Sequence, residues 1–399
     1  MTSSLSSFSR ISILCAAFFL LANIKYSSIF SADCSILLPM PCESRLGNCL
    51  SASCIAMYNP LQWCNKEKFS FVPKISLGGG LNSHVLFDQI ISPENIFCAW
   101  REFQKDKRDR RDVQEFEASA EVKIFELCAD LASGAYSHGS YTRFWVRDPK
   151  LRLIHKASVR DRLLHHAIFR VLYPVFNRKW IYDSYSSRDS KGTHAAMGRF
   201  RDFAWKVSRN NTRPVWVLKA DIRKFFDSID HGILVGLLDG VLSKDIRLMD
   251  LLRNNISSYS TMPGIGIPLG NLTSQLFANV YLNPLDQHIK RQLKVLYYLR
   301  YADDMIILSD SREFLNEILL PMTKFLEQRL KINLHPKKLS ISRWDKGVDI
   351  LGYISYPSKT VMRYSTQRRM MRRLEGQNSE VDFDIQLNAL YSRSKFERL

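Results

Sequence analysis

Two adjacent aspartates interrupt an apolar stretch of this 399-residue chain, and they constrain its fold more than any other feature. The segment LRYADDMIILS, residues 299–309, has strand-like flanks on both sides of Asp303 and Asp304. This pattern predicts a β-hairpin with the two acids at its turn. Adjacent carboxylates repel each other, and an ionised group that is buried without a partner is costly. A fold that keeps both acids there needs a compensating cation.

A third acid stands at the end of another predicted strand. The segment VWVLKADIRKFF predicts a strand over residues 215–220 that ends at Asp221. If the two strands are neighbours, Asp221 meets Asp303 and Asp304, and hard carboxylate oxygens suit Mg²⁺. Two Mg²⁺ ions about 3.5–4 Å apart would activate an attacking 3′-hydroxyl and stabilise a leaving pyrophosphate. The alternative, two ordinary turn aspartates at a hairpin tip, is disfavoured by the second acidic strand end.

Composition bounds the class of protein and its partners. Hydrophobic residues make up 46% of the chain and aromatic residues 12%, which supports a substantial core and excludes a disordered tail. The formal net charge is +18, and nearly all of it lies after residue 84. Such an excess favours a polyanionic partner, with nucleic acid first and an anionic membrane surface second.

The N-terminal region differs from the rest of the chain. All eight cysteines fall within the first 128 residues without a CxxC pair, so we expect isolated thiols rather than a zinc site or a disulfide framework. Residues 11–22, ISILCAAFFLLA, resemble the apolar core of a signal peptide but are too short to span a bilayer comfortably. We interpret them as an apolar N-terminal segment, or as the result of a start codon placed too far upstream. A membrane anchor is the alternative; we expect a cytoplasmic protein without stable membrane association.

Local patterns predict most of the remaining elements. A helix-rich region covers residues 93–134, and a two-stranded ribbon is expected around RDPKLR, residues 147–152. Further predictions are a helix that ends at Pro174, a helix that starts at Asn271 or Thr273, a helix interrupted at Pro321, and an extended region over residues 348–365.

The motifs that carry the acids resemble those of reverse transcriptases. YADD resembles the central palm motif of that family, LKADIRKFFDSIDH its first palm motif, and GIPLGNLTSQLFANVYLN its nucleotide-positioning motif. LHPKKLSI and ILGYISY are similar to the next palm motif and the primer-grip turn. RDPKLRLIHKASVRDRLLHHAI and SYSSRDSKGTHAA resemble two fingers motifs of bacterial, group II intron-like enzymes. Several motifs in the family's order, from about residue 85 to 365, are far more specific than one motif alone.

The resemblance implies an α+β right-hand polymerase fold with an antiparallel palm sheet, mainly helical fingers and a short helical thumb. We expect an N-terminal extension over residues 1–84, fingers over 85–214, a palm over 215–355, and the primer-grip end with a reduced thumb over 356–399. The basic segment TQRRMMRRLEGQ resembles a thumb helix. The implied partners are a template RNA, a DNA or RNA primer and deoxynucleoside triphosphates, and the implied cofactor is two Mg²⁺ ions.

One motif is similar to a narrower group. Most group II intron-like enzymes carry Gln before the glycine of the positioning motif and end it in Ser-Pro, whereas this chain has Leu269 before Gly270 and ends in Ser274 and Gln275. This pattern resembles diversity-generating retroelement reverse transcriptases, which copy a template RNA with errors at adenines and work with a basic accessory protein. Alternatives are a retron or group II intron enzyme, and a maturase-like RNA-binding protein without polymerisation.

The resemblance also assigns roles to single residues. Lys150 and Arg152 match basic fingers residues that clamp the triphosphate, and Phe226 matches the bulky residue that crowds the sugar 2′-position. Leu269, Gly270 and Gln275 are expected beside the incoming nucleotide, because they lie in the positioning motif; Phe225 is expected in the core. Lys338 is the expected proton donor to pyrophosphate, with Lys337 as its rival, while His165, His166 and His231 are expected to be structural.

Overall fold

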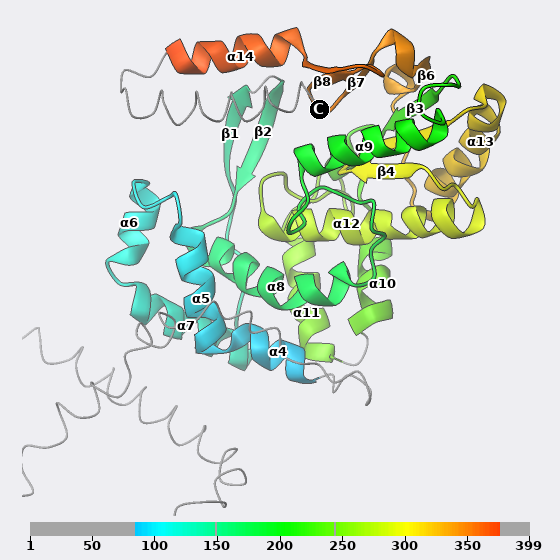
Figure 1. The fold of residues 1–399 in the computed structure, drawn as a ribbon. Helices are drawn as coiled ribbons and strands as arrows, with labels where there is room; N and C mark the ends of the chain where they lie inside the picture. The colour runs from blue at the N-terminus through cyan, green and yellow to red at the C-terminus, as the bar shows by residue number, and fades with distance from the viewer. Residues whose placement is uncertain (1–83, 148–149, 243–244, 376–399) are drawn as a thin grey trace, which may run out of the picture. The chain divides into compact units, whose positions relative to one another are not determined.

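The computed structural model describes residues 84–147, 150–242 and 245–375 (Figure 1). The predictions for residues 11–22 and for six of the eight cysteines lie outside these residues. Cys128 is a buried free thiol, as predicted. In the described part of the chain, no helix is both long enough and apolar enough to cross a bilayer.

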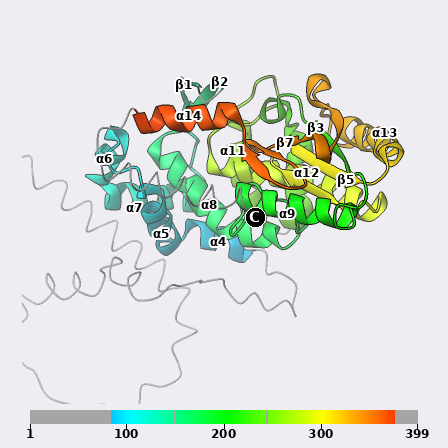
Figure 2. The same cartoon turned by 45° about the horizontal axis from the view of Figure 1, so that its top comes forward.

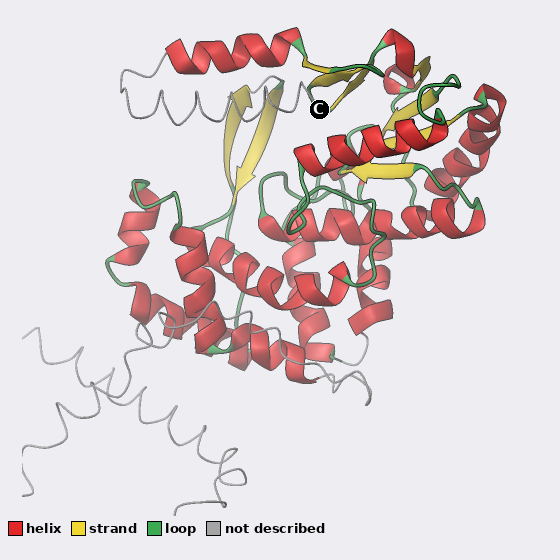
Figure 3. Cartoon of the chain, viewed as in Figure 1, coloured by secondary structure: helices red, strands yellow, loops and turns green. Residues whose placement is uncertain are grey.

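The first half of the described chain is mainly helical, with one β-hairpin whose first strand is exposed along its whole length and whose second strand is partly buried (Figure 3). Ser92 and Ser158 cap two of the helices, because each side chain accepts a hydrogen bond from a backbone N–H three residues later. The elements are α4 (His84–Ile91), α5 (Pro93–Gln104), α6 (Arg111–Glu117), α7 (Ala120–Ser133), β1 (Thr142–Arg147), β2 (Leu151–Lys156), α8 (Val159–Asn177) and α9 (Thr193–Val207). The antiparallel pairing of β1 with β2 confirms the predicted ribbon.

The second half alternates strands with helices. Its elements are β3 (Trp216–Asp221), the short helix η1 (Phe225–Ser228), α10 (His231–Leu242), α11 (Ile246–Ser257), α12 (Leu272–Gln287), β4 (Tyr298–Tyr301), β5 (Asp304–Ser309), α13 (Arg312–Arg329), β6 (Ser340–Arg343), β7 (Val348–Ile350), β8 (Tyr353–Ser355), β9 (Thr360–Met362) and α14 (Tyr364–Glu375). Helix α12 begins directly after Asn271, as predicted. The expected extended region forms the three-stranded antiparallel sheet β7-β8-β9.

The central sheet is antiparallel, with strand order β4-β5-β3-β6. Strand residues alternate between its two faces, and each face belongs to a different core cluster. On one face, Leu218, Tyr298 and Ile307 join the buried residues of α12 and α13. On the other, Leu299 and Ile306 pack with residues of α9 and the β7-β8-β9 sheet. Figure 2 shows α9 lying along the sheet. Layers on both faces bury the sheet and leave its strand ends as the place for polar chemistry.

The predicted breaks at Pro174 and Pro321 are wrong, because α8 and α13 both continue through their prolines. A proline inside a helix removes one hydrogen bond and costs about 3 kcal/mol. Apolar residues are buried on both sides of each proline, for example Ile318 and Met322 in α13. This packing outweighs the local penalty, and helix propensity alone does not report it.

The chain therefore has a mixed architecture of helices with antiparallel sheets, as expected for an α+β fold. One continuous core cluster extends from the N-terminal helices through α8 to α12 and α13. The predicted boundary between residues 214 and 215 falls between α9 and β3. The division into fingers, palm and thumb stays a prediction, although the predicted basic helix near the C-terminal end is present as α14.

Candidate active site

Three acids come from two adjacent strands of the central sheet. Strands β3 and β5 pair in antiparallel register, and this register places Asp221 opposite Asp304. Asp304 also lies opposite Tyr301 of β4, so Asp303 stands in the tight turn between β4 and β5. The prediction that the two acidic strand ends are neighbours is confirmed.

The three carboxylates interact unfavourably. Burial raises the pKa of Asp304 to about 6, and the charges of Asp303 and Asp221 add to the increase. Burial also raises the pKa of Asp303, again with a contribution from Asp221. The protein thus holds carboxylates close together where water screens them poorly, which favours a cationic ligand.

Two basic side chains reach this cluster. The Lys338 ammonium donates a hydrogen bond to Oδ2 of Asp221 at 2.5 Å. Arg152, on β2, opposes the increase in the pKa of Asp303, as does Lys338. Of the two basic residues that the sequence assigned to the site, Lys338 contacts an acid directly, and both favour the ionised form of Asp303.

The negative charge of the site favours a divalent cation, although its side chains do not form a complete coordination sphere. Oδ1 of Asp221 is buried and has no hydrogen-bond partner, although Oδ2 is paired. A carboxylate oxygen in this condition is available to a hard cation such as Mg²⁺. Among residues 84–147, 150–242 and 245–375, no three Asp, Glu, His or Cys side chains already stand in a metal-binding arrangement.

The turn before α12 packs against the hairpin. Gly270 has a φ of 108°, and a Cβ built on it would lie 3.2 Å from Cγ2 of Ile154 in β2. Arg152 is two residues before Ile154 and so shares its face of the strand. Leu269 is half-buried in the turn, while Gln275 is exposed in the first turn of α12. The absence of a side chain at Gly270 therefore allows the strand that carries Arg152 to approach.

Phe226 lies next to the same turn. Its carbonyl oxygen accepts a hydrogen bond from the N–H of Ile267 at 2.9 Å, which ties η1 to the loop that leads into Leu269. The Phe226 ring is partly buried and meets Phe225 edge-to-face, with centroids 5.5 Å apart. Phe225 is only 3% exposed, so its predicted core position is confirmed.

The two remaining predicted lysines, Lys150 and Lys337, are both exposed to solvent. Lys150 is exposed at the start of the hairpin's second strand, and Lys337 is exposed beside Lys338. Of the two rival lysines, Lys338 is the one that contacts an acid.

The three histidines have structural surroundings. His231 donates through Nε2 to the carbonyl oxygen of Gly266 at 2.7 Å. His165 is 1% exposed and contacts Asn255, and burial lowers the pKa of both His165 and His166. These contacts agree with the structural roles predicted for them.

Sequence reasoning missed Arg300, a buried cation next to the acidic turn. Its Nη1 donates to the carbonyl oxygen of Ala302 at 2.8 Å, and its side chain is almost completely enclosed. The available signal was a charged residue in the middle of a strand whose neighbours are apolar.

A comparison with known families decides the class of protein. The family described as reverse transcriptase (RNA-dependent DNA polymerase) matches residues 147–355, just over half of the chain. The chain belongs to the reverse transcriptase family. The matched span runs from the end of β1 to the end of β8, so it contains all three acids of the site.

Individual relatives of this reverse transcriptase are distant. It is 24% identical over 277 residues to protein YkfC of Escherichia coli (strain K12), covering 59% of this chain and 72% of YkfC. It is 22% identical over 344 residues to the group II intron-encoded protein LtrA of Lactococcus lactis subsp. cremoris, covering 67% of this chain and 56% of LtrA. A structure of telomerase from Candida albicans overlaps with a TM-score of 0.44 at 10% identity, covering 62% of this chain and 53% of telomerase. The chain spans about half the length of the latter two proteins, so their whole-protein activities do not transfer with the similarity.

Replacement of Gly270 should disturb the contact between turn and hairpin. In Gly270→Ala the new Cβ would press on Ile154 and would also occupy a left-handed backbone conformation that costs about 1–2 kcal/mol. If this cost of about 1–2 kcal/mol raises the activation barrier, primer extension on an RNA template should fall by roughly tenfold or more. Gly264→Ala is the matched control, since Gly264 also has a positive φ but nothing lies within 4 Å of a Cβ there. Equal losses in the two variants would contradict a specific role for the Ile154 contact.

Proposed function

We propose that this chain is an RNA-directed DNA polymerase that extends a primer along an RNA template by two-metal phosphoryl transfer. The observation that carries the proposal is the register of β3 with β5, which brings Asp221 and Asp304 together beside Asp303. Family membership supports the reaction, since the matched family is that of RNA-dependent DNA polymerases. The net charge of +18 supports a nucleic-acid partner.

The three acids would hold two Mg²⁺ ions, which when bound supply charge neutralisation for the attacking and leaving oxygens. The chain's own residues would position the other reactants. Arg152 would contact the triphosphate from β2, with Lys150 at the same end of the hairpin, because a guanidinium binds phosphate bidentately. Lys338 would stand beside Asp221 as the proton donor to the leaving pyrophosphate.

Loss of an acid should stop chemistry without releasing RNA. Asp303→Ala is expected to lower primer extension by at least about 100-fold, because metal stabilisation of the transition state is worth several kcal/mol. RNA affinity should change little, since basic contacts to phosphates supply most of it. Asp250→Ala is the control, because Asp250 pairs with Arg253 at the surface. Extension by Asp303→Ala within tenfold of the wild type would refute the assignment.

Phe226 is the proposed gate against ribonucleotides. It lies five residues after Asp221 and partly packs on the core, so its ring is supported from behind. Phe226→Ala should admit ribonucleoside triphosphates with little loss of deoxynucleotide use, because the ring no longer crowds the 2′-hydroxyl. Phe314→Ala, a partly buried phenylalanine against the same core on α13, controls for lost packing. An unchanged ratio of ribonucleotide to deoxynucleotide incorporation would place the gate elsewhere.

Within the family, we propose the diversity-generating retroelement type. The proposal rests on Leu269 before Gly270 and on Ser274 and Gln275 at the end of the motif. The implied function is error-prone copying of template adenines, together with a basic accessory protein. The similarity to LtrA favours a second candidate, a group II intron reverse transcriptase with ordinary fidelity.

Leu269 gives this subtype a physical basis. A glutamine at this position could hydrogen-bond the incoming nucleotide and hold it in register, whereas a leucine side chain cannot. One missing hydrogen bond is worth about 0.5–1.5 kcal/mol, enough to weaken discrimination against mispairs several-fold. The restriction of errors to adenines follows from the resemblance rather than from this hydrogen-bond argument.

Fidelity separates the two candidates. One RNA template is copied by the wild type and by Leu269→Gln, and the cDNA is sequenced; errors should concentrate at template adenines in the wild type and fall several-fold in the variant. Leu319→Gln, a partly buried leucine on α13, serves as the control for a buried amide elsewhere. An accurate wild type, or an unchanged adenine error rate in Leu269→Gln, would reject the subtype and leave the polymerase proposal intact.

A further inference from the structure

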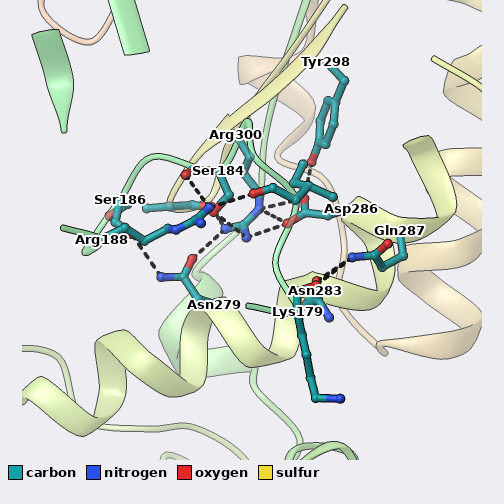
Figure 4. A network of polar contacts seen from close by, with 12 residues as sticks. Lys179, Ser184, Ser186, Arg188, Asn279, Asn283, Asp286, Gln287, Tyr298 and Arg300 are labelled. Atoms are coloured by element: carbon teal, nitrogen blue, oxygen red, sulfur yellow. Dashed lines mark hydrogen bonds and ion pairs between the residues drawn. The ribbon is translucent and has the colours of Figure 1, made fainter. Parts of the chain in front are cut away.

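Arg300 forms a buried ion pair with Asp286 (Figure 4). Its side chain and that of Asp286, on α12, are 1% and 0% exposed. Nε donates to Oδ1 of Asp286 at 2.9 Å and Nη2 donates to Oδ2 at 2.7 Å, which is bidentate geometry. The Tyr298 hydroxyl donates a further hydrogen bond to Oδ1 of Asp286 at 2.7 Å.

The remaining arm of the guanidinium points to the turn that presents the acids. Nη1 donates to the carbonyl oxygen of Ala302 at 2.8 Å and to Oδ1 of Asn279 at 3.2 Å. Ala302 has a φ of 53°, a left-handed conformation that is unfavourable for a residue other than glycine. The residue directly after it is Asp303, so the peptide held by Arg300 sets where that carboxylate begins.

Arg300 also joins this turn to a segment that is remote in the sequence. Its backbone N–H donates to the carbonyl oxygen of Asp183, and its own carbonyl oxygen accepts from the N–H of Tyr185, both at 2.9 Å. Asn279 continues the link, because its Nδ2 donates to the carbonyl oxygen of Ser186 at 3.0 Å. Three segments, 183–186, α12 and the β4–β5 turn, are therefore joined by Arg300 and Asn279.

We propose that Arg300 is a positioning residue that holds the 302–303 turn in the conformation that receives the metal. Stability alone does not explain a buried ion pair, because apolar residues of similar volume often stabilise a core as well or better. The planar fork explains it, since Arg300 contacts Asp286 and the Ala302 carbonyl at the same time. A lysine could neutralise Asp286 but could not make both sets of contacts. The consequence for catalysis rests on the proposed polymerase function.

The position of the pair on α12 adds a second link. This helix begins at Leu272, directly after the turn that contains Leu269 and Gly270, and it carries Asn279 and Asp286 along its length. One rigid element thus supports both the proposed nucleotide-positioning turn and the clamp on the acidic turn. Arg300 joins the acidic turn to this helix, and the 269–270 turn leads directly into its first residue.

The variant Arg300→Lys tests whether the two simultaneous contacts of the guanidinium matter. Two measurements are made on the whole protein in the absence of nucleotide and RNA. Hydrogen exchange of the backbone amides in residues 298–309 is measured in metal-free protein, and Mn²⁺ binding is measured by calorimetry. We expect faster exchange in this segment and about tenfold weaker Mn²⁺ binding, since a charge-assisted hydrogen bond to the turn is lost. Arg162→Lys is the matched control, because Arg162, on α8, is also a largely buried arginine and forms an ion pair with Asp112 of α6. Wild-type exchange and Mn²⁺ affinity in Arg300→Lys would overturn the proposal.

A double variant separates the proposed role of Arg300 from a general folding defect. Asp286→Leu with Arg300→Met removes both charges together and leaves no unpaired buried ion, so the core is expected to fold. It should reproduce the fast exchange and the weak Mn²⁺ binding, because the Ala302 carbonyl again lacks its donor. A folded double variant with wild-type exchange and metal affinity would show that the pair only fills the core, and so would reject the proposal.

Polymerase kinetics add a test of the catalytic consequence. In primer extension, Arg300→Lys should raise the Mg²⁺ concentration at half-maximal rate and lower kcat, while RNA affinity and the KM for deoxynucleotides stay near wild type. A change confined to KM or RNA affinity would contradict a role at the metal site. If the wild type itself did not extend primers, the polymerase proposal would fail, whereas the exchange and Mn²⁺ results would still decide the role of Arg300.

Discussion

Three carboxylates that repel one another stand together at one end of the central sheet, and the surrounding structure must hold them there. Asp221, Asp303 and Asp304 converge because β3 and β5 pair in a register that aligns their acidic ends. Burial and mutual charge raise the pKa values of Asp303 and Asp304, so this end of the sheet is held in an unfavourable electrostatic state. Such a state persists only because the surrounding structure holds the three acids together, and a divalent cation bound there would relieve it.

The surrounding layers provide that support. Helices α12 and α13 cover one face of the central sheet, and α9 with the β7-β8-β9 sheet covers the other. Two polar contacts stand at the strand ends, Lys338 on Asp221 and Arg300 on the peptide before Asp303, and the charge of Arg152 acts on Asp303 without a direct contact. These three cations have different roles, since Arg300 is enclosed while Arg152 and Lys338 reach the site from more exposed positions. The same sheet thus combines apolar faces that are buried on both sides with charged groups at its strand ends.

Much of the site could be predicted from local sequence, because its parts are local. The paired aspartates between apolar runs predicted the β4–β5 hairpin, and the acid after a strand predicted the end of β3 at Asp221. The breaks predicted at Pro174 and Pro321 were wrong, since buried side chains on both sides of each proline stabilise the continuous helix. Arg300 was missed, because a lone charge in a strand has no local feature that identifies its partner, Asp286 on α12.

The chemical class of this protein follows from its amino-acid sequence, because motif order, acid spacing and charge are properties of the chain. Which side chains meet depends on the tertiary structure. In the folded chain Asp221 lies opposite Asp304, Lys338 rather than Lys337 contacts an acid, and Gly270 lies against Ile154. These contacts join residues that are far apart in sequence, and strand register and helix packing bring them together. Local patterns report the period of an element and its ends, but they carry no information about the distance between two elements in space.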